Sequence, residues 1–179
     1  TLDGTLFPYT TLFRSATKNL VTVCNEIDAP LIFFSTDYIF DGTKKGEYLE
    51  TDKPQPLNFY GNTKFLAESF IMENAARAMI FRITWLFGRY GRCFPKAILR
   101  QAEEVKKMNV VNDQVGRPTY SVDLAQALGT IILQRNEHIF SKEKEVFHVG
   151  NHGTVNWAEF ARHILKTAGH SDVRVEEIT

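Results

Sequence analysis

The sequence predicts an α/β protein built on a parallel sheet. Two short apolar runs, residues 31–35 and 79–87, have the continuous hydrophobic character of strands buried on both faces of such a sheet. Each run follows a segment of helical spacing, from Ser15 to Ala29 before the first and residues 59–77 before the second. This alternation of helix and buried strand is typical of βαβ units.

The rest of the chain continues the alternation. Residues 41–58 are polar and contain two glycines and two prolines, which predicts a long loop. Asn156-Trp-Ala-Glu159 has the pattern of a capping box that opens a helix. We expect the later elements in this order: helix 94–107, strand 109–112, helix 121–135, strand 146–149 and helix 156–168.

The first fifteen residues do not fit this pattern. Thr5-Leu6-Phe7 recurs as Thr11-Leu12-Phe13, and no strand or helix pattern leads from this segment into the rest. The segment also lacks the charged and apolar regions of a secretory signal. We therefore expect residues 1–15 to be a foreign or disordered leader.

Composition narrows the range of partners. The 179 residues are 44% hydrophobic, and 21 basic side chains balance 21 acidic ones, so nothing draws the chain to nucleic acid. No run approaches the roughly 18 apolar residues that a membrane span needs.

Cys24 and Cys93 lie far apart, so reduced thiols and a cytoplasmic location are the default expectation. His148 and His152 lack a Cys or carboxylate companion, so we expect no metal site and a packed, hydrogen-bonded His148.

A tyrosine and a lysine at the start of the predicted helix 59–77 could carry chemistry. Tyr60 and Lys64 are four residues apart, which places them one turn apart on one helical face. The lysine ammonium is expected to lower the pKa of the phenol, which could then exchange a proton with a carbonyl or alcohol oxygen. Taken alone, the pair is equally compatible with an exposed lysine beside a half-buried tyrosine.

The segment Ser35-Thr36-Asp37 strengthens the catalytic interpretation. It follows the first buried run, and open α/β sheets bind their ligands at the carboxyl ends of strands. A hydroxyl at Thr36 could bind the same substrate oxygen as Tyr60. A threonine, a tyrosine and a lysine in this order form a three-part signal with a mechanism behind each part.

Several motifs resemble those of the dTDP-4-dehydrorhamnose reductases, which are extended short-chain dehydrogenases. The resemblance runs from about Ala16 to the end of the chain and rests on these segments in this order: Ser35-Thr-Asp-Tyr-Ile-Phe-Asp-Gly42, Tyr48-Leu-Glu50, Pro54 and Pro56, Tyr60-Gly-Asn-Thr-Lys64 with Glu68, Arg82-Ile-Thr-Trp-Leu-Phe-Gly88, Val111-Asn-Asp-Gln-Val-Gly-Arg-Pro-Thr119, Asp123-Leu-Ala125, Phe147-His148 and Trp157–Phe160.

The resemblance implies a Rossmann-type cofactor domain, a smaller α/β substrate-binding portion, and reduction of the 4-keto group of a dTDP-linked 6-deoxyhexulose with NADPH or NADH. Tyr60 matches the proton donor, and Lys64 matches the residue that holds the nicotinamide ribose. Thr36 matches the residue that orients the keto oxygen, and Ser35 lies beside the cofactor.

Three further residues match positions near the substrate, each with a structural alternative. Asp37 and Trp85 are expected near the sugar, although Trp85 on a buried strand could simply pack in the core. Arg117 is expected to contact the nucleotide or a phosphate, although residues 112–118 could equally form a plain turn. A homodimer is compatible with the resemblance, and the sequence does not define the assembly.

One motif of dinucleotide-binding folds does not occur. A Rossmann fold binds pyrophosphate through a Gly-rich turn after its first strand, and none of the eleven glycines here lie two residues apart. We therefore expect a partial Rossmann-type sheet that lacks its first strands. The expected division is a leader to residue 15, a truncated cofactor domain over 16–88 and a mainly substrate-binding domain over 89–179, from which some elements return to the sheet.

Two other functions stay open. A nucleotide-sugar epimerase or dehydratase would share the Thr–Tyr–Lys set, but a dehydratase needs an added acid–base pair, and no Glu follows Asp37 directly. A non-catalytic nucleotide-binding subunit, like the beta subunit of methionine adenosyltransferase, would not need a proton-transferring tyrosine.

Overall fold

A computed structural model describes residues 8–133 and 144–179, and the expectations that concern residues 1–7 and 134–143 lie outside this part. The chain divides into two compact units. One is formed by the residues up to Ile83 together with Thr130–Val149, and the other by Thr84–Gly129 with Gly150–Thr179.

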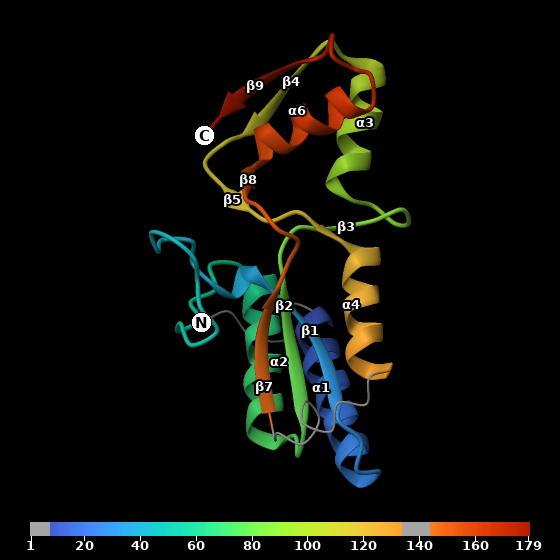
Figure 1. The fold of residues 1–179 in the computed structure, drawn as a ribbon. Coiled ribbons are helices and arrows are strands. Elements are labelled where there is room, and N and C mark those ends of the chain that lie inside the picture. The colour runs from blue at the N-terminus through green and yellow to red at the C-terminus, as the bar shows by residue number, and fades with distance from the viewer. Residues whose placement is uncertain (1–7, 134–143) are drawn as a thin grey trace. The chain divides into compact units, whose positions relative to one another are not determined.

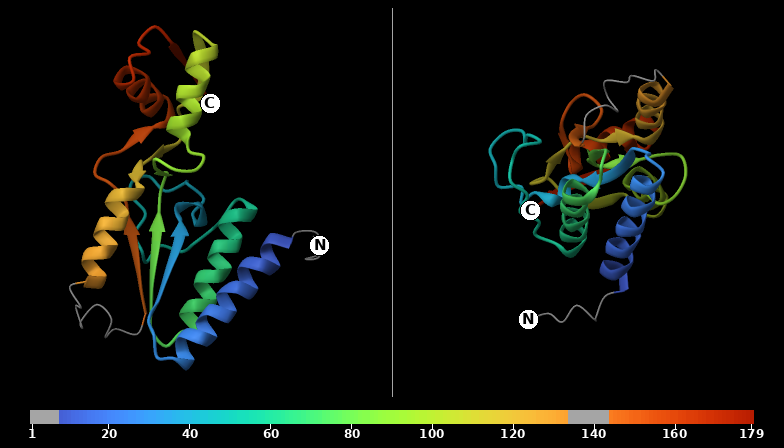
Figure 2. Two further views of the ribbon diagram at one scale, coloured as in Figure 1. Left: turned by 90° about the vertical axis from the view of Figure 1, so that its right-hand side faces the viewer. Right: turned by 90° about the horizontal axis from the view of Figure 1, so that it is seen from below.

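The first unit is a three-stranded parallel sheet with two helices against one face. Strands β1 (Leu31–Thr36), β2 (Ala78–Ile83) and β7 (Lys144–Val149) lie in the order β1-β2-β7. Helices α1 (Pro8–Glu26) and α2 (Phe59–Asn74) run side by side along this sheet (Figure 1 and Figure 2). The parallel α/β architecture predicted from the sequence is confirmed.

Alternation along the strands sorts the side chains onto two faces of this sheet. The apolar residues between the sheet and the helices are buried and form one core: Val21, Leu31, Ile71, Ala75, Ala78 and Ile80. On the opposite face, Phe34, Phe81 and Phe147 share one register row, with ring centroids 6.3 and 5.6 Å apart between neighbours. Strand β2 is buried on both faces, as its apolar run predicts, whereas in β1 Phe34 is 44% exposed.

Two predicted boundaries were wrong by more than three residues. The first helix begins at Pro8 and not at Ser15, as proline is well suited to the first helical position, where its missing N–H is not needed. The apolar run 79–87 is not one strand: β2 ends at Ile83, and Trp85 has a φ of 44° before the short strand β3 (Leu86–Phe87). A left-handed φ on a bulky residue interrupts any strand.

The second unit packs two helices against a two-stranded parallel sheet. Helices α3 (Phe94–Glu104) and α6 (Trp157–Thr167) bury apolar residues against β4 (Lys107–Val111) and β9 (Arg174–Ile178). The predicted capping box is confirmed, because the Asn156 and Glu159 side chains each accept a backbone N–H of the other residue.

Short strands complete this unit, and the sequence did not predict them, apart from β3, which lies inside the strand expected over 79–87. They pair β3 with β6 (Thr119–Tyr120) and β5 (Val115–Gly116) with β8 (Val155–Asn156). Helix α4 (Ser121–Leu133) begins directly after β6. Two-residue strands carry no periodicity, which is why the sequence did not indicate them.

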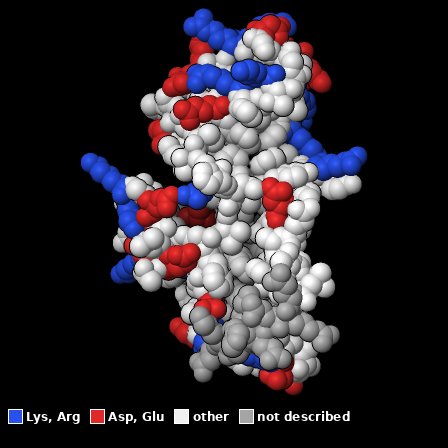
Figure 3. All heavy atoms as spheres, viewed as in Figure 1, with Lys and Arg blue, Asp and Glu red and all other residues white. Residues whose placement is uncertain are grey.

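The surface carries charges of both signs. On the face in Figure 3, basic and acidic side chains are interspersed, in keeping with the formal net charge of zero. Within residues 8–133 and 144–179, no helix has the length and apolar character to cross a membrane, and no cluster of three or more His, Cys, Asp or Glu could hold a metal ion.

Candidate active site

The structure brings five of the predicted site residues to one end of the first unit. Ser35 and Thr36 end β1, and Asp37 opens the 3-10 helix η1 (Asp37–Ile39). Tyr60 and Lys64 lie in the first two turns of α2. The carboxyl end of a parallel strand and the start of a helix therefore meet here, as open α/β sheets require for a ligand site.

A glycine allows α2 to start so close to η1. Asn58 caps the helix, and its side-chain oxygen accepts the Gly61 N–H at 2.7 Å. A Cβ on Gly61 would lie 2.0 Å from the Tyr38 carbonyl oxygen, so only glycine permits this approach. The Tyr38 and Tyr60 rings then meet edge to face, with centroids 6.1 Å apart. Local backbone packing thus fixes the position of Tyr60.

The Thr36 side chain makes hydrogen bonds with two neighbouring residues, Asp37 and Tyr38. Its hydroxyl donates to the Asp37 carboxylate at 3.0 Å, and its oxygen accepts the Tyr38 N–H at 3.3 Å, which caps η1. Thr36 is also buried. Its Oγ atom is therefore held at the end of β1, and in this structure the hydroxyl points to Asp37.

The pKa of Tyr60 is raised above its ordinary value of 10.0, first because of burial, while a hydrogen bond with the Thr36 side chain acts in the opposite direction and the Asp37 charge adds to the rise. The pKa of Tyr60 is thus raised, opposite to the predicted lowering. The influence of Thr36 on the pKa of Tyr60 places the two side chains near one another, while the expectation that both bind one substrate oxygen stays a prediction.

The Lys64 ammonium contacts strand β1. Its ammonium donates to the Phe34 carbonyl oxygen at 2.9 Å and lies 4.8 Å from the centroid of the Phe33 ring. Burial lowers the pKa of Lys64, and the Glu68 carboxylate acts in the opposite direction. The ammonium is therefore anchored at the carboxyl end of β1, one helical turn from Tyr60.

The Ser35 side chain places a hydroxyl in the buried end of β1. Only 6% of the residue is exposed, and its Oγ has no hydrogen-bond partner within the described part of the chain. A buried hydroxyl without a partner loses free energy, so such an atom in a ligand-binding position indicates a partner that comes with the ligand.

Sequence reasoning did not identify a buried ion pair behind these residues. Both Glu68 oxygens accept from Arg82, at 3.1 and 3.2 Å from Nε and 2.8 Å from Nη2. The two side chains are 4% and 7% exposed. A signal was available, because an arginine inside the apolar run 79–87 must find a charged partner when it is buried.

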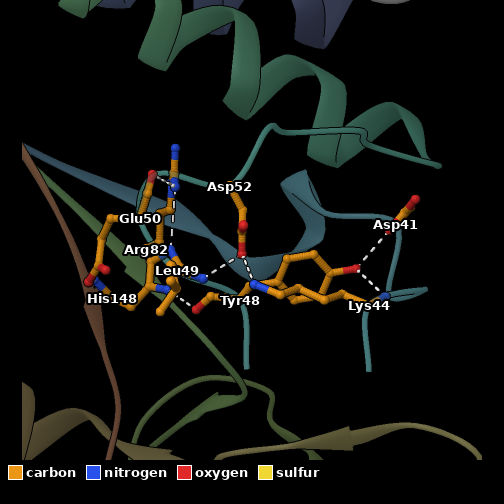
Figure 4. A network of polar contacts seen from close by, with 8 residues as sticks. All are labelled: Asp41, Lys44, Tyr48, Leu49, Glu50, Asp52, Arg82 and His148. Atoms are coloured by element: carbon orange, nitrogen blue, oxygen red, sulfur yellow. Dashed lines mark hydrogen bonds and ion pairs between the residues drawn. The ribbon is translucent and has the colours of Figure 1, made fainter. Parts of the chain in front are cut away.

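The predicted polar loop is fastened to this pair. Arg82 Nη1 donates to the Glu50 carbonyl oxygen at 3.2 Å, and the His148 N–H donates to the Glu50 carboxylate at 2.9 Å (Figure 4). The His148 ring lies 3.1 Å from the Tyr48 carbonyl oxygen and 3.3 Å from Arg82 Nη1, so the expectation of a packed, hydrogen-bonded imidazole is confirmed. Burial, the largest cause, lowers the pKa of His148.

A second set of contacts stiffens the same loop. The Tyr48 hydroxyl donates to Asp41 at 2.7 Å, and Lys44 pairs with Asp52 (Figure 4). The Tyr48 ring stacks on Phe40 with centroids 4.3 Å apart. These contacts thus hold the loop in place beside β2 and β7.

Trp85 and Arg117 belong to the second unit. The Trp85 ring stacks on Trp157 with centroids 3.5 Å apart, and a Cβ on Gly116 would lie 2.4 Å from it. The Arg117 carbonyl oxygen accepts the Thr119 hydroxyl at 3.2 Å, which ties down the turn before β6. Their expected contacts with sugar and nucleotide stay predictions.

A parallel α/β sheet with a threonine at the end of a strand and a Tyr–Lys pair at the start of the next helix defines the short-chain dehydrogenase/reductase class. Within it, the chain belongs to the RmlD substrate binding domain family, whose sequence model matches residues 11–179.

Relatives agree with this assignment. The chain is 33% identical to a dTDP-4-dehydrorhamnose reductase of Sinorhizobium fredii over 152 residues, which cover 85% of the chain and 51% of that protein. It is 36% identical to the spore coat polysaccharide biosynthesis protein SpsK of Bacillus subtilis, over 80% of the chain and 48% of that protein. The chain spans about half the length of the curated relatives it matches.

Solved structures show the same fold. A dTDP-4-dehydrorhamnose reductase of Bacillus anthracis in complex with NADP matches with a TM-score of 0.82 and 33% identity, over 91% of the chain and 55% of that structure. An orthologue from Clostridium acetobutylicum matches equally well, with a TM-score of 0.82.

Proposed function

We propose that this chain forms the catalytic and sugar-binding part of an NADPH- or NADH-dependent reductase that converts dTDP-4-dehydro-6-deoxy-L-mannose to dTDP-L-rhamnose. One observation carries the proposal: the Thr36 hydroxyl, the Tyr60 phenol and the Lys64 ammonium converge at the carboxyl end of β1. Family membership and the names of the relatives support the choice of substrate.

Tyr60 acts as the acid in this reaction. Reduction of a ketone adds a hydride to carbon and a proton to oxygen, and a bound dihydronicotinamide would supply the hydride. The raised pKa of Tyr60 keeps the phenol protonated at neutral pH, as a proton donor requires. The proton passes from Tyr60 Oη to the keto oxygen, and solvent then restores it.

Thr36 orients the keto oxygen. In the structure its hydroxyl donates to Asp37, so substrate binding requires the hydroxyl to turn from the carboxylate to the incoming oxygen. The Asp37 carboxylate would then accept a hydrogen bond from a sugar hydroxyl. We place Trp85 beside the sugar and Arg117 at the nucleotide diphosphate, since a guanidinium suits phosphate oxygens.

The residues present fit one end of the cofactor. Lys64 would bind the hydroxyls of the nicotinamide ribose, and the unpartnered Ser35 Oγ would bind beside it. The sequence contains no Gly-rich turn for the pyrophosphate. We therefore expect tight cofactor binding to need the segment that the resemblance places upstream of Ala16.

A fluorescence titration with NADPH tests this division of labour. The chain as given and a version that carries the upstream family segment are titrated in parallel, and each is assayed for NADPH-dependent reduction of the hexulose. We expect tight binding and turnover only in the extended version. An extended version that binds NADPH but leaves the hexulose unreduced would contradict the proposed substrate.

A further inference from the structure

The residue just before β3, Trp85, has an unusual backbone conformation. Its φ of 44° lies in the left-handed region that bulky residues rarely adopt. The Trp85 carbonyl oxygen accepts the Thr119 N–H at 3.1 Å, so the backbone is held where β3 pairs with β6. Strain of this kind persists only where the surrounding structure imposes it, and it is concentrated at ligand-binding sites. The conformation of Trp85 therefore indicates a role beyond chain connectivity.

The arrangement of the Trp85 ring is imposed by its neighbours as well. The ring stacks on Trp157 with centroids 3.5 Å apart and planes 12° from parallel. Aromatic pairs prefer offset or edge-to-face arrangements to such direct overlap. Gly116 borders the same indole, since a Cβ there would lie 2.4 Å from Cε2. These two neighbours confine the indole to one orientation, although Trp85 stays partly exposed.

Trp157 is itself fixed by several contacts. It is the first residue of α6, and a capping box fixes the start of that helix. Its indole N–H donates to the Gln114 side-chain oxygen at 3.3 Å. The Phe94 ring lies against it, with centroids 4.4 Å apart. Trp157 can therefore act as a rigid support for the Trp85 ring.

We propose that Trp157 is a positioning residue that holds the Trp85 indole in the orientation in which it meets the sugar. The inference rests on the proposed function for the role of Trp85, whereas the support of one indole by the other concerns the second unit alone. Trp157 touches no substrate in this account and acts through Trp85. A ring that is already oriented loses less conformational freedom when the ligand binds, which lowers the cost of binding.

The mobility of the Trp85 ring tests the inference on the chain as given. Trp85 and Trp157 are its two tryptophans, so Trp85 is the sole tryptophan in Trp157→Phe and in Trp157→Leu. In Trp157→Phe, which keeps a flat ring, we expect the decay of fluorescence anisotropy to follow the tumbling of the chain. In Trp157→Leu the decay should gain a fast component. Equal decays in the two variants would overturn the inference.

A second substitution covers the case in which Trp157→Leu does not fold. Trp157→Met fills the space with a flexible side chain, and the same fast component is expected. Failure of both variants to fold, as judged by circular dichroism, would also overturn the inference, because Trp157 would then serve folding alone. Ile164→Val is the matched control, since it removes one buried methylene from the same helix and should leave the anisotropy decay of the parent chain unchanged.

Kinetics of the extended protein test the link to the sugar. In Trp157→Leu the KM for the hexulose should rise by about 2- to 12-fold, the range that corresponds to one aromatic contact, while kcat is unchanged. Trp157→Phe should restore most of the parent KM, and Ile164→Val should keep it. An unchanged KM in a variant with a mobile Trp85 would overturn the inference.

The two proposals can fail separately. If Trp85 becomes mobile in Trp157→Leu but the extended protein does not reduce the hexulose, the proposed function is wrong and the support of Trp85 by Trp157 stands. If the extended protein reduces the hexulose and Trp85 is equally immobile in Trp157→Leu and Trp157→Phe, only the positioning role is wrong.

Discussion

The two units bury different kinds of side chain. In the described part of the chain, almost all buried polar or charged residues lie in the first unit. They are Thr17, Ser35, Thr36, Thr63, Glu68 and Arg82. The second unit buries one such residue among those described, Thr119. The core of the second unit is apolar, and its ion pairs, such as Lys107–Glu176, lie on the surface. Burial of a polar group costs free energy unless a partner satisfies it.

This contrast indicates where function is located. The second unit follows the ordinary rule for stability, in which close apolar packing stabilises the fold and surface pairs add little. The first unit carries a buried ion pair and an unpartnered Ser35 hydroxyl within a few residues of Thr36 and Lys64. Under the proposed function, this polar interior serves the chemistry at the end of β1.

Breaking the ion pair should produce the largest effect on stability. Arg82→Met leaves Glu68 charged and buried without its partner, and we expect a loss of about 3–5 kcal/mol. The two tryptophans, Trp85 and Trp157, both lie in the second unit, so hydrogen exchange at β1 and β2 amides reports the first unit, and tryptophan emission reports the second. The loss should appear in the exchange rates of the first unit.

The double variant Glu68→Leu with Arg82→Met is the matched control for this prediction. It removes both charges, so most of the lost stability should return. Equal losses in the single and double variants would show that packing, and not the unpaired charge, dominates in the first unit as well.

Overpacking should produce a smaller effect, in the second unit. A Cβ on Gly116 would lie 2.4 Å from the Trp85 ring, so Gly116→Ala must displace the indole and should cost about 1–3 kcal/mol. The tryptophan emission transition in urea should move to lower denaturant. Gly129→Ala, in α4 with nothing within 4 Å of the added Cβ, should instead stabilise slightly, and equal shifts in the two variants would contradict the packing argument.

Acid should weaken the first unit through His148. Because burial lowers the pKa of His148 below 6.5, the unfolded chain takes up a proton at a pH where the folded chain does not. The contribution of the neutral His148 to stability is therefore complete above pH 6.5 and declines as the pH falls toward the pKa of His148 in the folded protein. The free energy of opening at β7, obtained from exchange rates corrected for the intrinsic base-catalysed rate at each pH, should therefore fall from pH 7 to pH 5.5. In His148→Asn this fall should be shallower, and an identical pH dependence in both proteins would exclude His148 as its source.

The smallest effect is expected at the surface of the second unit. Lys107 and Glu176 are 2.7 Å apart with partly exposed side chains, and exposed pairs contribute little. Lys107→Ala should leave the urea midpoint of tryptophan emission unchanged within error, at low and at high salt. A salt-dependent fall in the midpoint would show that the second unit also depends on its charges.

The sequence predicted the parallel sheet because burial on both faces leaves a direct trace in composition, as at Ala78–Ile83. It also predicted the capping box at Asn156, because that cap is encoded within four consecutive residues. It missed β9 (Arg174–Ile178), where charged and apolar residues mix and only pairing with β4 defines the strand. Tertiary contacts supply that information.

The candidate site shows the same division. Thr36, Tyr60 and Lys64 were predicted from spacing and strand position, and the structure brings them together. The pairing of Glu68 with Arg82 and the anchoring of Lys64 on the Phe34 carbonyl oxygen depend on how α2 lies against the sheet. Spacing along one helix could not reveal either contact.

The central claim is that Tyr60 is the proton donor of a reductase, and Tyr60→Phe tests it most directly. In the protein extended by the upstream family segment, this change removes one hydroxyl and leaves the ring contact with Tyr38 in place. We predict that NADPH-dependent reduction of the dTDP-linked hexulose falls by about 10²- to 10⁴-fold while NADPH binding and circular dichroism are unchanged. Turnover retained at the level of the parent protein would contradict the account.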